Sequence, residues 1–244
     1  MTAVVLGATA GVGRALGREL ARRGIDLLLV GRDRPSLEAE AAHLALIYGV
    51  KVATLVADAT RAKEFAERVV AGCREAESVE ALLCPIGLSR PNDDGSQSFA
   101  ELQALIDTNF TAVMAAVELV LPLMITANRG TVIAFSSIAT ARGRRANVVY
   151  SAAKRGLESY FESLRHKLVG TEVRAIVFRL GYVATKQTHG KQLLFPTVSP
   201  EAVASAVCDS IPGSSGVRTF PLFWRPVVGL LRLLPWSIFG RLRF

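Results

Sequence analysis

Residues 1–13 read MTAVVLGATAGVG, an apolar run that passes directly into a glycine-rich turn. The run predicts a buried strand, and the turn predicts the start of a helix. Glycines at such a junction let the backbone approach a pyrophosphate, and the amino end of the helix supplies unpaired N–H groups. The stretch therefore predicts a nucleotide site. The residues expected to contact the nucleotide here are Gly7, Thr9, Gly11, Val12, Gly13 and Arg14.

Apolar runs and helical patterns alternate along most of the chain. Further strands are predicted over residues 26–30, 52–57, 79–84, 131–136, 173–179 and 217–220, with helices between them. The helix expected over residues 99–127 contains Pro122, where we expect a bend. Apolar strands separated by helices are typical of a parallel sheet covered on both faces. The sequence therefore predicts one α/β domain over residues 1–222.

Composition narrows the class of partner. The net charge of +8 favours anionic partners such as a nucleotide, a phosphorylated lipid or an anionic membrane surface. The sequence has no basic stripe interleaved with aromatic residues, so we expect no nucleic-acid partner. Cys73, Cys84 and Cys208 have no metal-type spacing, so we expect no metal site and a reducing compartment. No charged segment precedes the first apolar run, so we expect no signal peptide and a cytoplasmic location.

The ends of the second and third strands bear on the type of nucleotide. Arg32 follows the second strand, and an arginine there accommodates a ribose 2′-phosphate, which favours NADPH. Asp33 keeps NADH open, because an acidic residue there binds the ribose hydroxyls. Asp58, after the third strand, could accept hydrogen bonds from the adenine amine or cap the next helix.

The run YSAAK places Tyr150 and Lys154 four residues apart, and Ser137 lies thirteen residues before Tyr150. Positions i and i+4 share one face of a helix. A phenol has an ordinary pKa of about 10, and a neighbouring cation lowers it. A serine hydroxyl could hold a substrate oxygen against the phenol. The set suits proton transfer to or from a carbonyl or alcohol oxygen.

In order and spacing, the chain resembles the short-chain dehydrogenase/reductase family at Gly7, Gly11, Gly13, Asp58, Asn109, Ser137, Tyr150 and Lys154. The resemblance implies a Rossmann-like, doubly wound parallel sheet of about seven strands and a nicotinamide cofactor, NADP(H) by preference, with NAD(H) open. It implies that Tyr150 is the general acid and that Lys154 lowers its pKa and binds the nicotinamide ribose. It also implies that Ser137, chosen over Ser136 for its interval, orients the carbonyl, while Asn109 supports a proton relay.

Two cofactor motifs depart from that family. Residues 84–87 read Cys-Pro-Ile-Gly where the family often has Asn-Asn-Ala-Gly, and only Gly87 is kept. The proline removes a backbone donor at this edge. After the sixth strand the family's Pro-Gly is Leu-Gly. The residues still expected at the cofactor here are Gly181, Val183 and Thr185, with Thr185 at the nicotinamide carboxamide.

Three arginines, Arg142, Arg144 and Arg145, lie between Ser137 and Tyr150, in a segment that borders the active site in the family. Guanidinium groups bind phosphate oxygens in a bidentate manner. The loop after Thr185 adds Lys186, His189 and Lys191. We expect a substrate with a phosphate near its ketone. A solvated basic face or a subunit salt bridge is the alternative.

The C-terminal tail, residues 223–244, predicts an amphipathic helix. From residue 211 onward the chain has five arginines and no acidic residue. The stretch from Trp224 to Leu234 would be roughly 16 Å long as a helix, far short of a membrane span. We therefore expect the tail to lie on the inner membrane surface. A core or dimer helix with an arginine rim is the alternative.

The arginine segment and the tail also resemble a narrower group, the decaprenylphosphoryl-2-ketoribose reductases. This resemblance implies reduction of a polyprenyl-phosphate-linked 2-keto-pentose, an arabinan precursor, with a partner oxidase for the epimerisation. That group is described with NADH, which Arg32 does not match. Alternatives are reduction of another hydrophobic ketone, of ketoacyl, sphingoid or steroid type, and a non-catalytic nucleotide-binding protein. The family suggests a homo-oligomer.

Overall fold

The structure is a computed structural model. It describes all residues except 92, 186, 187, 189, 191, 192, 243 and 244. The predicted anion contacts Lys186, His189 and Lys191 lie outside the described residues.

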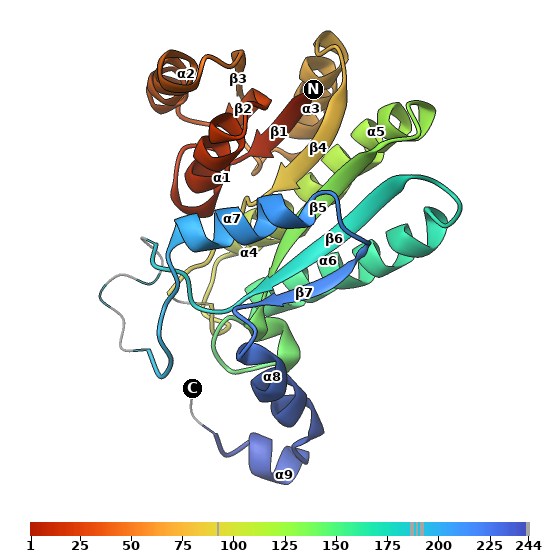
Figure 1. The fold of residues 1–244 in the computed structure, drawn as a ribbon. Helices are drawn as coiled ribbons and strands as arrows, with labels where there is room; N and C mark the ends of the chain where they lie inside the picture. Colours follow the sequence, from red (N-terminus) through yellow and green to blue (C-terminus); the bar gives the residue numbers. More distant parts are fainter. Residues whose placement is uncertain (92, 186–187, 189, 191–192, 243–244) are drawn as a thin grey trace.

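One sheet organises the described chain, and it confirms the predicted doubly wound α/β fold. Its seven strands are parallel and lie in the order β3-β2-β1-β4-β5-β6-β7 (Figure 1). The strands are β1 (Thr2–Leu6), β2 (Asp26–Gly31), β3 (Val52–Val56), β4 (Val79–Cys84), β5 (Gly130–Ser137), β6 (Val173–Leu180) and β7 (Gly216–Phe220). The order reverses between β1 and β4, and ligands of such sheets bind beyond the carboxyl ends of the strands at this point.

Helices cover both faces of the sheet (Figure 1). On one face lie α1 (Gly11–Arg22), α2 (Arg34–Tyr48) and α7 (Pro200–Ser210), and on the other lie α3 (Ala62–Glu75), α5 (Ala112–Thr126) and α6 (Val148–Lys167). Each face has its own core. Leu16, Leu37 and Val203 are fully buried in one, and Val117 and Phe161 in the other. These two cores fix the strand ends that carry the site.

The helical stretch from Phe99 to Thr126 contains an irregularity that was not predicted, and it lies before Pro122. α4 (Phe99–Ile106) passes through the π-helical turn η1 (Asp107–Thr111) into α5, and Pro122 lies inside α5. By length and composition the whole stretch could cross a membrane, yet half of its most apolar window is buried. It is a core helix, because Val117 and Val120 pack into the sheet-facing core.

The tail forms α8 (Trp224–Leu233) and the short α9 (Trp236–Phe239), beyond the carboxyl ends of β6 and β7 (Figure 1). Trp224 is only 2% exposed. It packs on Gly181 so closely that a Cβ there would lie 2.0 Å from the indole Nε1. α8 also contacts the 3-10 turn η2 (Ile138–Ala141) that follows β5. The tail is therefore amphipathic and helical, as predicted, and it folds back on the body.

Candidate active site

The turn between β1 and α1 has the form of a nucleotide cradle. Gly7 has a φ of +84°, which disfavours residues with a Cβ. A Cβ on Gly13 would lie 2.0 Å from the Gly7 carbonyl oxygen, so the helix starts against bare backbone. Ala10, the N-cap of α1, has no side-chain acceptor, and the first turn has no acidic residue. The turn and its helix amino end fit a pyrophosphate, which is the group expected there.

The other predicted cofactor segments converge on this turn. A Cβ on Gly7 would lie 2.7 Å from Ile86 Cγ2, and one on Gly11 would lie 3.2 Å from Thr185 Cγ2. A Cβ on Gly31 would lie 3.2 Å from Thr9 Cγ2, so the Thr9 side chain also packs on a glycine. Val183 is instead buried in the core, and Val12 is partly buried against the same core.

The adenosine end of the site is basic. Arg32 is exposed and lines a cleft of about 270 Å³ together with Asp58, Arg61 and Arg68. The Asp58 carboxylate accepts from the Thr60 N–H at 3.0 Å, whereas the N-cap of α3 is Arg61. The alternative interpretation of Asp58 as a helix cap is therefore wrong.

Arg14 is turned toward α2. Its Nε lies 3.4 Å from an oxygen of the buried Glu40, which also accepts two hydrogen bonds from Arg18. Arg14 therefore shares the single charge of Glu40 with Arg18 and is directed away from the turn, so Arg32 is the better candidate for an anionic group of the cofactor.

The four predicted catalytic residues meet at the carboxyl edge of the sheet. Ser137 ends β5, Tyr150 and Lys154 lie one turn apart on α6, and Asn109 lies in η1. The Ser137 hydroxyl lies close enough to the Tyr150 phenol to act on it, because it lowers the pKa of that phenol. Ser136, the neighbour rejected on spacing, donates instead to Glu158 at 2.5 Å. Ser137 is thus the serine that reaches the phenol.

The segment after β4 joins Lys154 to Asn109. Lys154 is 3% exposed, and its Nζ donates to the Ile86 carbonyl at 3.2 Å. The buried Asn109 side chain accepts from Leu88 N–H at 3.1 Å and donates to the Leu88 carbonyl at 2.7 Å. A Cβ on Gly87 would lie 3.3 Å from Asn109 Oδ1 and 3.6 Å from Lys154 Nζ. The glycine kept from the family pattern therefore lets these two groups approach.

The pKa of the phenol differs from the sequence-based expectation. Burial raises the pKa of Tyr150, while the hydrogen bond to Ser137 and the charge of Arg144 act in the opposite direction. Lys154 donates to a backbone carbonyl rather than to the phenol, so it does not offset the burial. Burial also lowers the pKa of Lys154 to about 8. The phenol is a neutral acid at physiological pH in this structure.

The three arginines predicted at the substrate do not surround the catalytic cleft. Arg142 donates to the Leu234 carbonyl of the tail, and its guanidinium lies 4.4 Å from the Phe239 ring centroid. Arg144 and Arg145 line a separate cavity with the tail, although the charge of Arg144 still acts on Tyr150. Arg142 is therefore a structural contact of the tail, and its role as a substrate ligand stays a prediction.

Comparison with known proteins agrees with this geometry. Residues 1–193 match the short chain dehydrogenase family. An oxidoreductase of Mycobacterium tuberculosis is 30% identical over 98% of this chain and 96% of its own length. A ketoacyl reductase of a Nostoc species is 28% identical over 86% of this chain and 75% of its own length.

The chain belongs to the short-chain dehydrogenase family. It is an NAD(P)-dependent oxidoreductase, and members of this family act on small-molecule substrates and often form oligomers.

Two solved structures share the fold. The structure of a 7β-hydroxysteroid dehydrogenase has a TM-score of 0.87 at 20% identity and covers 98% of this chain and 95% of its own. A short-chain dehydrogenase of Sphingobium yanoikuyae in complex with NADPH has a TM-score of 0.82 at 24% identity and covers 100% of this chain and 96% of its own.

Sequence reasoning missed a buried network beneath the catalytic serine. Glu158 of α6 accepts from Arg179 of β6 at 2.6 Å, from Ser136 and from Thr140 at 2.8 Å. Thr140 also donates to the Ser137 carbonyl at 2.7 Å. Burial acts to raise the pKa of Glu158, but the hydrogen bonds from Arg179 and Ser136 lower it below its usual range. An arginine at the end of the apolar β6 was the available signal for such a partner.

Asp93 was also missed, because it lies in a polar loop far from α6 in sequence. It is 1% exposed, and its carboxylate accepts from the backbone N–H groups of Val149 at 2.9 Å and Tyr150 at 2.8 Å. Its carbonyl accepts from Val148 N–H. The helix N-cap, Asn147, makes no side-chain cap. Asp93 therefore caps the helix that carries the phenol.

Replacing Asp93 with Ala should destabilise the protein by about 1–2 kcal/mol, because two buried N–H groups lose their acceptor. It should also lower kcat, since one of those groups belongs to Tyr150. Urea unfolding and initial rates measure both. The matched variant Asp94→Ala removes an exposed carboxylate that bonds only within its own loop, to Ser96. Equal losses in the two variants would contradict the capping role.

Replacing Lys154 with Met should stabilise the cofactor-free protein at pH 7 while removing turnover. The lysine pKa falls from 10.5 to about 8 on folding, so the unfolded chain binds more protons between these values. The gain should reach about 3 kcal/mol below pH 8 and fade as the pH rises toward 10.5. Unfolding free energies at several pH values test this. Lys167→Met, on the exposed face of the same helix, should show no such trend.

Proposed function

We propose that the protein uses NADPH to reduce a ketone carried by a lipid, at the inner surface of a membrane. The observation that carries this proposal is the placement of Ser137 beside Tyr150, whose pKa it lowers, next to the nucleotide turn and on the side of the molecule where the apolar, arginine-rich tail lies. In this division residues 1–222 form the catalytic domain, and residues 223–244 form a membrane-surface anchor. The location is cytoplasmic.

The proposed chemistry follows from the protonation states. A bound nicotinamide cofactor supplies the hydride for the carbonyl carbon. Ser137 donates a hydrogen bond to the carbonyl oxygen, and Tyr150 gives its proton to that oxygen as negative charge develops there. The raised pKa of Tyr150 keeps the phenol protonated until that moment. The Lys154 ammonium, held at the Ile86 carbonyl, would bind the nicotinamide ribose of a bound cofactor, and Asn109 fixes the loop that holds the lysine.

The preference for NADPH rests on the basic adenosine end. Arg32, Arg61 and Arg68 border one cleft, and guanidinium groups pair well with a 2′-phosphate. Glu64 lies 3.6 Å from both Arg61 and Arg68, which leaves Arg32 as the best placed of the three. The neighbouring fold from Sphingobium yanoikuyae was solved with NADPH. NADH remains the alternative, through the adjacent Asp33.

Two substrate classes have support. The name of the Nostoc relative favours a ketoacyl chain. A polyprenyl-phosphate-linked 2-keto-pentose, reduced together with a partner oxidase, is favoured by Arg144, whose charge reaches the catalytic phenol. Both substrates carry a ketone and a long apolar chain. The exposed apolar side chains of the tail would contact that chain while the ketone enters the active site.

Arg32→Ala should lower kcat/KM for NADPH at least about tenfold and change the value for NADH little, because one charge-assisted phosphate contact is lost. Arg34→Ala is the matched control, since Arg34 is exposed nearby and pairs with Glu38. Initial rates with both cofactors measure the effect. A parent enzyme that prefers NADH, unchanged by Arg32→Ala, would contradict the NADPH assignment.

A hydride-transfer assay with a panel of ketones tests the reaction itself. The panel comprises a 3-oxoacyl thioester, a steroid ketone, a polyprenyl-phosphate-linked keto-sugar and a small water-soluble ketone. We expect the lipid ketones to be reduced with far higher kcat/KM than the soluble one, and Tyr150→Phe to lose at least about a hundredfold. Equal rates across the panel would remove the lipid assignment, and no reduction by a folded, cofactor-binding protein would favour the non-catalytic alternative.

A further inference from the structure

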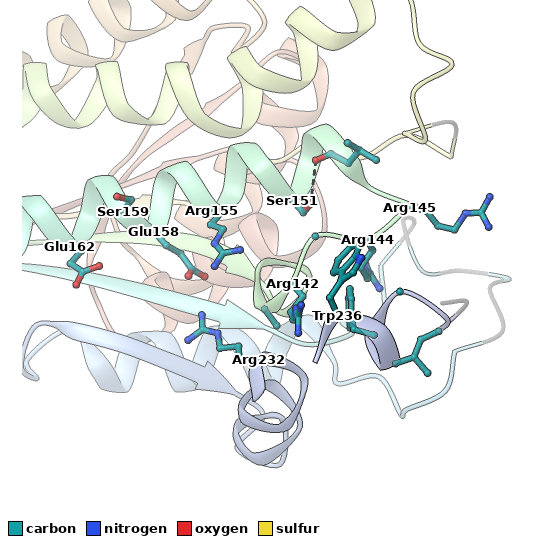
Figure 2. A pocket seen from close by; sticks show the side chains of 16 residues that line it. Arg142, Arg144, Arg145, Ser151, Arg155, Glu158, Ser159, Glu162, Arg232 and Trp236 are labelled. Atoms are coloured by element: carbon teal, nitrogen blue, oxygen red, sulfur yellow. Dashed lines mark hydrogen bonds between the residues drawn. The ribbon is translucent and has the colours of Figure 1, made fainter. Parts of the chain in front are cut away.

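A large cavity lies beside α6, the helix that carries Tyr150 and Lys154. It has a volume of about 1030 Å³, and three parts of the chain line it: the segment Ala141–Arg145, one face of α6, and the tail. Ser137, Tyr150 and Lys154 are not among its lining residues. Figure 2 shows α6 forming one wall of the cavity and the tail another. The cavity is therefore distinct from the site of the proposed reaction.

The walls of this cavity are strongly basic. Five arginines line it, against two glutamates, and they are Arg142, Arg144, Arg145, Arg155 and Arg232. Glu158 is already paired with Arg179, with 2.6 Å between Oε2 and Nη2. Within the described part of the chain no carboxylate lies within ion-pair distance of Arg155 or Arg232. In Figure 2 these two side chains extend toward the same space from α6 and from α8. Such a pair of guanidiniums suits a phosphate.

The tail wall owes its position to Arg142. This guanidinium donates to the carbonyls of Leu231 and Leu234 and lies against the Phe239 and Trp236 rings, with its Cζ 4.4 and 5.9 Å from their centroids. These contacts close the turn between α8 and α9. Arg142 therefore builds the cavity, while Arg155 and Arg232 remain to bind an anion.

The tail that lines the cavity also exposes apolar side chains to solvent. Trp236, a lining residue, is 70% exposed, and Leu242, which also lines the cavity, is exposed as well. Leu230, Leu233 and Ile238 are exposed elsewhere on the same short tail. The chain has no acidic residue from Ile211 onward. An anionic head group in the cavity would leave its apolar chains beside these side chains. This combination of phosphate-binding arginines and exposed apolar side chains on the tail fits a lipid at a membrane surface.

We propose that this cavity binds the phosphate head group of an anionic phospholipid, with the exposed side chains of the tail inserted in the same leaflet. The proposal extends the membrane association proposed above, and it does not depend on the reaction or on its substrate.

The test uses full-length protein and dihexanoyl phosphatidylglycerol below its critical micelle concentration. Trp236 lines the cavity and Trp224 is buried, so the tryptophan fluorescence of the protein reports on the site. We expect saturable binding of this lipid and no saturable binding of dihexanoyl phosphatidylcholine or of inorganic phosphate. Equal binding of inorganic phosphate would reduce the site to a plain anion site and overturn the proposal.

Two double variants with equal charge loss separate the cavity from general electrostatics. Arg155→Gln with Arg232→Gln should weaken phosphatidylglycerol binding at least about tenfold, since two charge-assisted contacts are lost. Arg225→Gln with Arg241→Gln removes two tail charges outside the lining and should leave the binding of lipid monomers unchanged. Equal weakening in both double variants would overturn the proposal.

A third variant keeps the test valid if the double variant Arg155→Gln with Arg232→Gln fails to fold. Ser159 is exposed on α6 and lines the cavity, so Ser159→Trp fills the space without removing a charge. It should also abolish the binding of lipid monomers, while circular dichroism and the melting temperature stay close to those of the parent. Lipid binding that survives in Ser159→Trp would overturn the proposal. A parent protein that sediments as a dimer and binds no lipid would also overturn the proposal, because a second copy would then cover the cavity.

Discussion

The buried ion pair between Glu158 and Arg179 holds the catalytic geometry together. Its shorter contact is 2.6 Å, and both side chains are nearly buried. The pair joins the helix that carries Tyr150 to the strand next to the one that ends in Ser137. A buried pair of this kind adds little net stability, but removing one partner would leave an uncompensated charge. The hydrogen bond from Ser136 extends the same constraint to β5, so the serine and the phenol face each other by construction.

This frame explains why burial decides the protonation states. Burial of the phenol and of the ammonium disfavours the charged form of each. A neutral phenol is the correct form for donating a proton to a carbonyl oxygen during reduction. The ammonium is bound to a carbonyl of the loop after β4, and that loop also holds Asn109 and overlies the nucleotide turn. Cofactor binding and proton donation are thus linked through one short segment.

The sequence was sufficient where the signal was local. The glycine turn after β1 and the YSAAK spacing on α6 lie where they were expected, because strand–turn–helix geometry and helical periodicity act over a few residues. The missed contacts join distant positions: Asp93 with Tyr150 across 57 residues, and Arg142 with Leu234 across 92. The irregularity at η1, which contains Asn109, was not predicted, because proline is the visible disruptor in the sequence and none lies there. From the sequence alone, arginines near Tyr150 are equally suited to bind a substrate or to contact the tail. The three-dimensional fold determines which of these contacts forms.

The two proposed sites use neighbouring faces of α6: one face carries the catalytic residues, and the other lines the cavity. Tyr150 and Lys154 are four residues apart, and Ser151, Arg155 and Ser159 repeat the same spacing one residue later. One residue turns a helix by about 100°, so the second set faces away from the crevice. The helix is capped at one end by Asp93 and tied to the sheet by Glu158, so it acts as a rigid wall between the two spaces. Arg144 belongs to both, because it lines the outer cavity while its charge acts on the phenol. An anion bound in the outer cavity would therefore act on the reaction through the field of this arginine rather than through movement of the helix.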